Sequence, residues 1–504
     1  MFHITTLATL GIESIPVTVE TDVAFGLTAF NIVGLPDTSV KESRDRIRAA
    51  IRNSGFTFPR GRITVNLAPA DVRKQGPLYD LPIALSILVA TGDLPRSTIQ
   101  RAVFVGELAL DGSVRPVQGT LLAAIMAKKH EKNDVFVPSQ NTKEAGAIEG
   151  LRVYGTPSLR EVVDHLKGIV PLSLTQVTHT QTHTSGEDLA SIKGQETAKR
   201  ALEIAAAGGH HILLKGPPGG GKTLLARALP SILPHLSYAE SVEVTSIASV
   251  AGVLAHDQGL IEERPFRSPH HSSSAVSLVG GGTWPKPGEV SLAHRGVLFL
   301  DELPEFSRYA LEHLRQPLED GSVTISRAVG CVQFPARFLL VAAMNPCPCG
   351  HLTNPHRACT CSFNQIAHYQ KKISGPLLDR FDLVIEVGAV EHDKLLSSDK
   401  AESSSCVRTR VEQAREAQRA RLEPLGMFTN SEISASRLDE LSPLTDDTRT
   451  LLASALRANH LSARGYMRVR KVARTIADLA GLADVRAEHI AEALQYRGQD
   501  HVQA

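Results

Sequence analysis

The stretch that decides the fold is Gly216-Pro217-Pro218-Gly219-Gly220-Gly221-Lys222-Thr223, which matches G-x-x-x-x-G-K-[ST]. An apolar run at 212–214 precedes it, and residues 224–229 continue with the composition of a helix. Glycines let backbone N–H groups curl around phosphate oxygens, and the helix that follows directs its positive end at them. We expect Lys222 to reach the β- and γ-phosphates of ATP and the Thr223 hydroxyl to bind Mg²⁺. The stretch therefore predicts a nucleotide site in an α/β domain.

A second feature of this domain is a short apolar strand at 297–300 that ends in Asp301-Glu302. A carboxylate at a strand end beside the phosphate loop holds Mg²⁺ through water, and a second one polarises the attacking water. We assign Asp301 to Mg²⁺ and Glu302 to the general base. A third apolar run, at 338–343, completes a set typical of strands that are covered on both faces, so we expect a parallel sheet.

The length of 504 residues predicts about three domains. Strands are expected at 16–21 and 63–67, helices at 39–53 and 82–90, and a hairpin over 103–112. A polar stretch that includes His179 and His183 is interpreted as a solvated linker rather than a metal site. The predicted parts are an N-terminal α/β domain at 1–170, the linker at 171–187, the ATPase core at 188–395 and a helical C-terminal domain at 396–504.

Bulk composition is that of a globular protein without strong charge. The hydrophobic fraction is 42%, the charged fraction 21% and the formal net charge +1, so bulk charge neither suggests nor excludes a nucleic-acid partner. No secretory signal is apparent, and the apolar run at 81–90 is far short of the ~20 residues that a membrane helix needs. We expect a cytoplasmic protein with no membrane partner.

Four of the six cysteines fall in one short segment, as Cys347-Pro348-Cys349 and Cys359-Thr360-Cys361. Two C-x-C pairs supply four thiolates, the set that a closed, structural Zn²⁺ site uses. A reducing compartment favours such a site over disulfides. His351 and His356 are alternative ligands, and a set of reduced thiols in a loop is the alternative to any metal.

Longer motifs carry a specific resemblance. The phosphate loop, Asp301-Glu302, the 344–346 stretch Met-Asn-Pro and the 377–382 stretch Leu-Leu-Asp-Arg-Phe-Asp resemble an AAA+ ATPase. Within that class, Arg264–His271 and Gly288–His294 resemble the magnesium-chelatase-like ATPases. The similarity to the ComM/YifB family covers nearly the whole chain. It includes 31–36 (Asn-Ile-Val-Gly-Leu-Pro) and 66–71 (Asn-Leu-Ala-Pro-Ala-Asp).

The resemblance implies further roles. Asn345 would be sensor 1, which helps to position the water or the γ-phosphate. Arg380 would be the arginine finger that acts on the neighbouring subunit's nucleotide, so a homo-hexameric ring is expected. Arg464 would be sensor 2, with Arg468 as the other candidate. A planar, permanently charged guanidinium suits the developing charge on a transferred phosphate, although an isolated Arg is more often a surface ion-pair partner.

Residues 1–170 resemble the Lon-protease-like domain of the ribosomal S5 domain 2 type, whose peptidases use a Ser–Lys dyad. In the matching stretch at 74–80, Leu78 occupies the nucleophile position and has no nucleophilic atom. The stretch at 117–122 offers no Lys where one is expected, and Lys128 and Lys129 are interpreted as solvated helix charges. We therefore expect this fold without peptidase activity.

Two segments bear on the substrate. Between Arg449 and Arg474 lie seven basic residues and no acidic one. Such a face suits a phosphate backbone, and equally nucleotide sensing or subunit contacts. The stretch at 266–286 carries Arg267, two histidines, three consecutive glycines and the single Trp. It is interpreted either as a pore loop that grips DNA or as a structural insert.

The leading hypothesis is an ATP-driven DNA translocase or helicase, because ComM-type proteins are linked to branch migration of DNA during natural transformation. The expected partner is single-stranded or branched DNA. Recombination proteins are further partners that the resemblance implies. Two alternatives stay open: a motor subunit of the magnesium-chelatase type, and an AAA+ protein that remodels other proteins.

Overall fold

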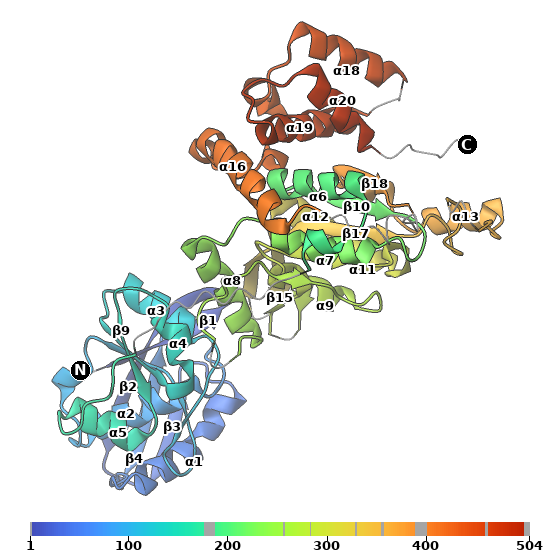
Figure 1. Cartoon of the computed structure of the whole chain (residues 1–504). Helices are drawn as coiled ribbons and strands as arrows, with labels where there is room; N and C mark the ends of the chain where they lie inside the picture. Colours follow the sequence, from blue (N-terminus) through green and yellow to red (C-terminus); the bar gives the residue numbers. More distant parts are fainter. Residues whose placement is uncertain are drawn as a thin grey trace. The chain divides into compact units, whose positions relative to one another are not determined.

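In the computed structural model, the described residues are 3–175, 187–255, 258–282, 284–327, 330–353, 357–388, 401–458 and 462–497. They divide into two compact units (Figure 1). Unit 1 takes the N-terminal residues to 181 together with two later segments, 238–262 and 326–334. Unit 2 takes the rest. Residues 176–186 of the predicted linker, with His179 and His183, lie outside the described residues, and so does the predicted boundary at 395/396. The four-part division of the sequence stays a prediction.

Unit 1 is built on a mixed seven-stranded sheet. Its strand order is β3-β4-β2-β1-β5-β8-β9. Strand β2 pairs antiparallel with β1 and with β4, whereas the pairs β3–β4, β1–β5, β5–β8 and β8–β9 are parallel. The strands are β1 (Ile4–Leu10), β2 (Glu13–Ala24), β3 (Ala29–Val33), β4 (Arg62–Ala68), β5 (Ala102–Phe104), β8 (Asp134–Pro138) and β9 (Arg152–Thr156).

The helices of unit 1 follow from local signals. The Asp37 side chain caps α1 by accepting from the Val40 N–H, and α1 buries Ile47 and Ile51. In α2 every residue but the last is buried, which accounts for its mostly apolar sequence. The helices are α1 (Thr38–Asn53), α2 (Asp80–Ala90), α3 (Thr120–Lys129), α4 (Thr142–Gly146), α5 (Leu159–Leu166) and α8 (Tyr238–Ala251).

Helix α8 belongs to unit 1 although its sequence lies inside the ATPase segment. Ser249 is 3% exposed, and its hydroxyl donates to the buried Glu144 carboxylate at 2.5 Å and accepts from the Gly119 N–H at 3.0 Å. Val242 and Val250 pack against the apolar core of the N-terminal residues. A segment that follows the phosphate-loop helix in sequence is therefore part of the N-terminal unit.

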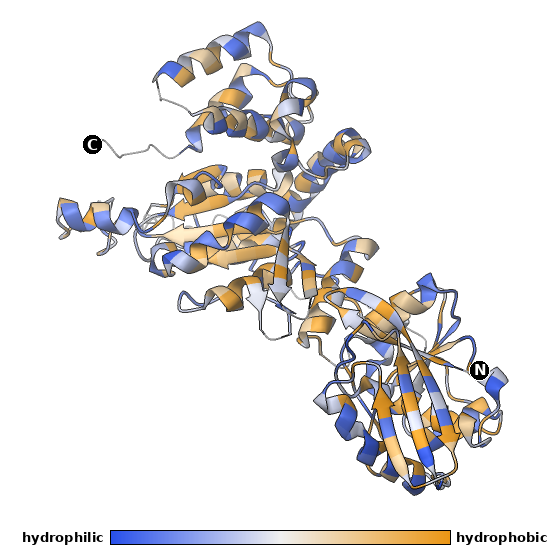
Figure 2. Cartoon of the chain, turned by 180° about the vertical axis from the view of Figure 1, so that it is seen from behind, coloured by the Kyte–Doolittle hydropathy of each residue, from blue (hydrophilic) through white to orange (hydrophobic). Residues whose placement is uncertain are grey.

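Unit 2 contains an all-parallel five-stranded sheet in the order β11-β14-β17-β10-β18. Its central strands, β14 and β17, are buried along their whole length, as parallel strands covered on both faces require. Figure 2 shows hydrophobic residues concentrated on the strands. The strands are β10 (Ile212–Lys215), β11 (Phe266–Arg267), β14 (Val297–Leu300), β17 (Leu339–Met344) and β18 (Leu383–Glu386).

Helices make up the rest of unit 2, and the C-terminal region is helical throughout its described residues. They are α6 (Glu196–Gly208), α7 (Lys222–Ile232), α9 (Ala275–Val279), α10 (Glu289–Leu292), α11 (Arg308–Glu312), α12 (Arg315–Asp320), α13 (Phe363–Gln370), α14 (Gly375–Leu378), α16 (Ser404–Leu422), α17 (Leu438–Leu441), α18 (Asp446–Ala458), α19 (Ala463–Leu479) and α20 (Ala487–Gln495). The short strands of the chain are β6 (Glu107–Leu108), β7 (Val114–Arg115), β12 (Gly280–Gly281), β13 (Lys286–Pro287), β15 (Ser322–Arg327) and β16 (Gly330–Pro335).

The predicted α/β class, the parallel sheet and the helical C-terminal region are confirmed. One local prediction needs correction. The hairpin expected over 103–112 is split, because β5 joins the main sheet while β6 pairs with β7 across the turn at Asp111 and Gly112. Within the described residues, none of the helices combines the length and the apolar character that crossing a bilayer needs.

A buried polar cluster fixes the C-terminal helices. Asp478 is 7% exposed and accepts from Arg474 at 2.8 Å, Arg421 at 2.8 Å and Asn430 at 2.8 Å. Arg474 is 1% exposed and also donates to backbone carbonyls. Each charge of this cluster is matched by hydrogen bonds, the condition under which a buried pair is tolerated.

Removing one charged side chain from this cluster should therefore lower the free energy of unfolding substantially. Asp478→Ala is expected to lower the free energy of unfolding by about 3–5 kcal/mol, because it leaves buried guanidinium charge without compensation. Denaturant unfolding followed by circular dichroism measures it. The matched control is Asp446→Ala, which removes an exposed partner of Arg449 and should change stability little. Equal effects of the two changes would contradict the assignment.

Candidate functional site

The predicted nucleotide residues meet at one edge of the unit 2 sheet. The phosphate loop follows β10, Asp301 and Glu302 follow β14, and Asn345 follows β17. These three strands are parallel, with Lys215 beside Met344 and Leu300 beside Ala342. Their carboxyl ends therefore lie at the same edge, where open parallel sheets bind ligands.

Lys222 is the first residue of α7 and is 9% exposed. Its Nζ donates to the carbonyls of Gly216 at 2.7 Å and Pro217 at 2.8 Å, and to Asn345 Oδ1 at 3.2 Å. Burial lowers the pKa of Lys222, and the nearby Asp301 carboxylate opposes that shift. The Lys222 ammonium thus bridges two carbonyls of the phosphate loop and connects them to Asn345, the predicted sensor 1.

The loop backbone explains its glycines. Gly219 and Gly221 have φ of 80° and 84°, in the left-handed region that glycine adopts freely. At Gly216 a Cβ would lie 2.0 Å from the Val387 carbonyl oxygen, so only glycine fits. Pro217, Pro218 and Gly220 complete the turn between β10 and α7.

The two predicted Mg²⁺ residues face each other. Thr223 Oγ1 donates to Asp301 Oδ2 at 2.9 Å. Adjacent oxygens in an octahedral Mg²⁺ shell with bonds of about 2.1 Å lie about 3 Å apart. The pair therefore suits a single Mg²⁺ ion, which Thr223 Oγ1 would bind and which Asp301 would hold either directly or through water.

Glu302 holds an uncommon backbone conformation, with φ of 51° in the left-handed region. A residue with a Cβ pays about 1–2 kcal/mol there. The Glu302 N–H donates to Asp301 Oδ1 at 2.9 Å. The Glu302 carboxylate is 57% exposed, and its Oε2 lies 3.4 Å from His271 Nδ1. The predicted general base thus points outward from the strand edge.

The cysteine loop begins directly after Asn345 and Pro346 and packs against the phosphate loop. Gly350 has φ of 80°, and a Cβ there would lie 2.6 Å from Pro218 Cδ. The Gln370 amide donates to the Pro346 carbonyl at 3.2 Å. The loop is therefore built into the wall of the nucleotide site.

The four cysteines converge on one point. The Sγ atoms of Cys347, Cys349, Cys359 and Cys361 lie within 4.8 Å of one another, and Cys347 is 3.4 Å from Cys349 and 3.6 Å from Cys359. Tetrahedral Zn²⁺ with Zn–S bonds of about 2.3 Å places its sulfurs about 3.8 Å apart. The donor set fits zinc.

The structure describes only one of the two alternative zinc ligands, His351 and His356. His351 is absent from the cluster, and its buried Nδ1 has no hydrogen-bond partner among the described residues. His356 lies outside the described residues.

We expect near-stoichiometric zinc in the purified protein, and loss of most of it in Cys359→Ser, because a structural site needs all four thiolates. Metal analysis by mass spectrometry measures both. Cys331→Ser and Cys406→Ser are matched controls, since both thiols are exposed and outside the cluster. Protein without zinc, or equal zinc in Cys359→Ser and the controls, would refute the site.

Arg380 lies at the other edge of the sheet from the phosphate loop. It follows α14 and directly precedes β18, which runs parallel to β10 with Leu383 beside Ile212. At about 3.3 Å per residue, four strand residues separate the two edges by about 13 Å. Arg380 pairs with Glu319 of α12, and its buried Nε has no hydrogen-bond partner among the described residues. Burial, and then the charge of Arg464, lower the pKa of Arg380.

The two sensor 2 candidates lie beside Arg380. Arg468 donates to Asp379 at 3.0 Å and to the Phe381 carbonyl at 2.7 Å, and it is only 15% exposed. Arg464 is 58% exposed and 3.9 Å from Asp379. Arg468 thus holds α19 against the Asp379 turn, whereas Arg464 has a loosely held guanidinium at the same edge.

The basic stretch at 449–474 does not form an open basic face. Arg470 and Arg474 are buried, with Arg470 paired to Asp439. Lys471 donates to the Ser431 carbonyl at 2.8 Å. Internal contacts use Arg468, Arg470, Lys471 and Arg474, whereas Arg449, Arg457 and Arg464 stay exposed.

The 266–286 stretch is partly ordered into secondary structure. Arg267 makes a bidentate pair with Glu289 at 2.6 and 2.8 Å and is thereby part of the scaffold. Beyond it come α9 and a hairpin in which Gly281 pairs with Lys286. Gly280, Gly281 and Gly282 have φ of 100°, 150° and 103°, which explains the glycine run. Lys286, on the second strand, is exposed.

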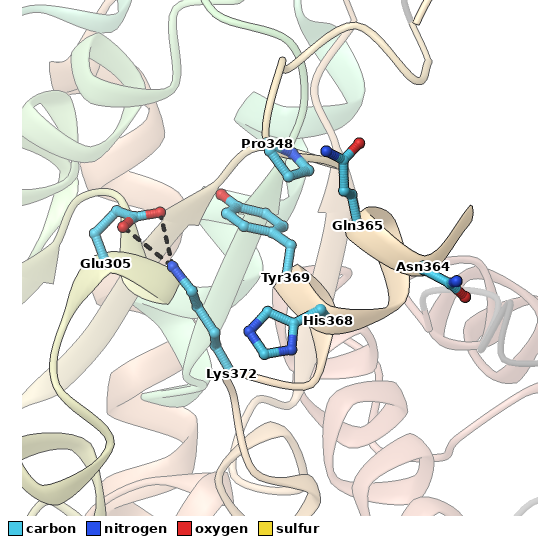
Figure 3. Close-up of a pocket in the computed structure, with 7 residues that line it drawn as sticks. All are labelled: Glu305, Pro348, Asn364, Gln365, His368, Tyr369 and Lys372. Atoms are coloured by element: carbon cyan, nitrogen blue, oxygen red, sulfur yellow. Dashed lines mark hydrogen bonds and ion pairs between the residues drawn. The ribbon is translucent and has the colours of Figure 1, made fainter. Parts of the chain in front are cut away.

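A pocket of about 410 Å³ lies beside the cysteine loop (Figure 3). Lys372 reaches Glu305 at 3.2 Å, and His368 and Tyr369 extend from α13. Burial raises the pKa of Tyr369 to about 12, so its hydroxyl stays neutral. The residues that line the pocket are Glu305, Pro348, Asn364, Gln365, His368, Tyr369 and Lys372.

In unit 1 the residues that match the peptidase dyad region are structural. Leu78 is buried in the short turn Pro77–Tyr79. The Lys74 ammonium is buried and donates to the Pro69 carbonyl. Leu121 and Leu122 are buried in α3, and Lys128 and Lys129 at its end are exposed. This region presents apolar side chains where a dyad would stand.

Sequence reasoning missed three site contacts. His271 faces Glu302, Glu319 pairs with Arg380, and Gln195 Nε2 donates to the carbonyls of Gly220 and Gly388 at 3.2 and 2.7 Å. All three depend on side chains from segments distant in sequence. Of these three contacts, only that of His271 had a sequence signal, the His270-His271 pair within the chelatase-like motif.

Three family models match successive segments. The model for "Magnesium chelatase, subunit ChlI" matches residues 188–395, the model for "Subunit ChlI of Mg-chelatase" matches 19–141, and its C-terminal model matches 401–497. The match at 188–395 covers the segment that holds the phosphate loop, Asp301 and Asn345.

Curated relatives match over almost the full length. Competence protein ComM of Haemophilus influenzae is 45% identical over 97% of this chain and 96% of its own. The uncharacterized protein YifB of Escherichia coli is 43% identical over 99% of this chain and 97% of its own. Lon protease 2 of Bacillus subtilis is 31% identical over 27% of this chain and 26% of its own.

Proposed function

The chain belongs to the ComM/YifB family of magnesium-chelatase-like AAA+ ATPases, and from that membership we propose that it is a ring-forming motor that uses ATP hydrolysis to move DNA. The proposed task is translocation or branch migration of recombination intermediates during natural transformation. The Haemophilus influenzae relative, 45% identical over 97% of this chain, carries the name of a competence protein, which supports that assignment.

ATP binding rests on the carboxyl edge of the sheet. The phosphate loop wraps the β- and γ-phosphates, and Lys222 exchanges its carbonyl partners for phosphate oxygens. Thr223 and Asp301 would hold Mg²⁺, which offsets phosphate charge when bound. Glu302 takes a proton from the attacking water, and Asn345 orients that water or the γ-phosphate.

The positions of Arg380 and Arg464 are the observation that supports a ring-shaped oligomer. Arg380, with Arg464 beside the same Asp379 turn, lies at the opposite end of β18 from the phosphate loop, and that strand is about 13 Å long. A guanidinium must contact the γ-phosphate to stabilise its developing charge. We propose that both act on the nucleotide of a neighbouring subunit, which makes a closed homo-oligomer, by resemblance a hexamer, the catalytic form.

The DNA contact is assigned to the 266–286 stretch of unit 2, which is called the insertion below. Its exposed Lys286 and its glycine hairpin provide charge and a narrow backbone for a pore. Because Arg470 and Arg474 of the 449–474 stretch are buried in internal contacts, the insertion is the preferred candidate for gripping DNA.

The proposal predicts that DNA raises kcat for ATP hydrolysis, with a Kd for DNA that weakens at higher salt. A coupled-enzyme ATPase assay with and without single-stranded or four-way-junction DNA measures this. Lys286→Ala should reduce the stimulation, and Lys193→Ala, outside the insertion, is the control. ATPase activity without any response to DNA would favour a chelatase-type motor or a protein-remodelling ATPase instead.

A further inference from the structure

His210 lies at a junction of three segments in unit 2. It stands between α6 and β10, and it is fully buried. Its Nδ1 lies 3.2 Å from Asp382 Oδ2, and its Nε2 lies 2.8 Å from Thr475 Oγ1. Asp382 ends the turn at 379–382, which carries Arg380 and is called the arginine turn below, and Thr475 belongs to α19. One imidazole therefore connects the arginine turn to α19.

The backbone around the imidazole is shaped to admit it. Gly208 ends α6, and a Cβ there would lie 2.2 Å from His210 Nε2. Gly209 has φ of 70°, in the left-handed region that glycine adopts freely. The Asp382 N–H donates to the His211 carbonyl at 2.9 Å, which fixes the start of β18 beside the ring. The two glycines thus let the chain place this imidazole between the arginine turn and α19.

Both partners of His210 are themselves held in place. Asn430 donates to Thr475 Oγ1 at 3.0 Å, and Thr475 Oγ1 lies 3.1 Å from the Lys471 carbonyl oxygen. Burial opposes ionisation of Asp382, but the hydrogen bond from His210 and nearby positive charges lower the pKa of its carboxyl. The ionised carboxylate accepts from the imidazole, because it has no proton to donate. Loss of the imidazole would leave this carboxylate without that donor and would release α19 at Thr475.

Helix α19 holds the arginine turn at two points. Arg468 donates to the Phe381 carbonyl at 2.7 Å and to Asp379 at 3.0 Å. About two helical turns further along α19, Thr475 reaches the same turn through His210. Two separated contacts fix both the position and the angle of the turn relative to the helix, whereas one contact leaves a hinge. The direction of the arginine side chain therefore depends on His210 as well as on Arg468.

We propose that His210 is a positioning residue that keeps the arginine turn in register with α19, so that Arg380 reaches the nucleotide of a neighbouring subunit. The inference rests on the proposed function, because it takes Arg380 to act in trans. Misplacement of a catalytic group by about 1 Å can lower a rate by about 100-fold. A buried side chain that never touches ATP can therefore set the rate of hydrolysis.

The first test is steady-state ATPase kinetics of the full-length chain. His210→Gln keeps an amide near the position of Nε2 and removes the Nδ1 donor to Asp382. It should lower kcat by about 10- to 100-fold and leave KM for ATP within about twofold of wild type, because Lys222 and the phosphate loop are unchanged. His210→Asn, which places an amide nitrogen near the position of Nδ1, should keep kcat within about threefold of wild type.

Mixed rings separate a misplaced Arg380 from a general defect. His210→Gln subunits keep an intact phosphate loop, and Lys222→Ala subunits keep a correctly placed Arg380, so a mixture of the two should regain activity. A mixture of His210→Gln with Arg380→Ala should regain none, because no subunit supplies a correctly placed guanidinium. The matched control is His211→Gln, which changes the adjacent imidazole, whose Nδ1 accepts from the Leu340 N–H at 3.1 Å. The control should hydrolyse ATP within about threefold of wild type.

Recovery with Lys222→Ala and none with Arg380→Ala supports the inference. Wild-type turnover of His210→Gln, recovery with Arg380→Ala, or recovery in neither mixture overturns it. If circular dichroism shows that His210→Gln does not fold, Thr475→Val serves in its place, because it keeps the side-chain size and removes the hydroxyl at Nε2, and the same pattern is expected. A mixture of Arg380→Ala with Lys222→Ala that stays inactive refutes the trans action of Arg380, so failure of the proposed function is distinguished from failure of the role of His210.

Discussion

Replacing Glu302 with Gln is expected to lower kcat for ATP hydrolysis by about 10²- to 10⁴-fold, the usual contribution of a general base. Gln keeps the size of the side chain and cannot take a proton from water. Lys222, Thr223 and Asp301 remain in place, so ATP binding should persist and the variant should trap ATP.

Single-turnover hydrolysis and binding of a fluorescent ATP analogue separate the two effects. The matched control is Glu305→Gln, which changes a carboxylate three residues later that pairs with Lys372 and lines the α13 pocket. That variant should keep its turnover within a few-fold of wild type. Equal turnover in Glu302→Gln and wild type would remove Glu302 from the mechanism.

Replacing Arg380 with Ala should have an effect as large, about 10³- to 10⁵-fold on kcat, the range found for arginine fingers. Its placement at the far edge of the sheet makes a further prediction. Subunits with Arg380→Ala have an intact phosphate loop, and subunits with Lys222→Ala have an intact Arg380. A mixture of the two inactive variants should therefore regain activity.

In a ring assembled at random from equal amounts of the two variants, about a quarter of the interfaces join an intact phosphate loop to an intact Arg380. Partial recovery in the mixture, and none in either variant alone, is the expected result. Because Glu319 pairs with Arg380, Glu319→Ala is the control for loss of local structure, and it should leave most of the activity. Absence of any recovery on mixing would place Arg380 in its own chain's site or outside the reaction.

The sequence predicted those parts of the site that depend on short-range pattern. The glycines of the phosphate loop, the apolar strand before Asp301 and the apolar strand before Asn345 each occupy a few consecutive residues. Parallel strands bring their carboxyl ends together, so the meeting of Lys222, Asp301 and Asn345 followed from these patterns. The four cysteines were predicted by the same kind of local spacing.

What sequence did not predict depends on long-range packing. Nothing in 238–251 marks α8 as part of the N-terminal unit, because its partners, Glu144 and Gly119, lie more than a hundred residues earlier. The seven basic residues at 449–474 suggested an exposed basic face. Only the tertiary structure pairs Arg470 with Asp439 and Arg474 with Asp478. The contact of His271 with Glu302 arises in the same way.

The measurement that tests the DNA-motor proposal most directly is migration of a labelled four-way junction by the purified protein, followed on native gels. Wild type with ATP should convert the junction to its products, and Glu302→Gln should bind the junction and leave it unmoved. A wild-type protein that hydrolyses ATP but neither binds nor moves the junction would contradict a DNA motor.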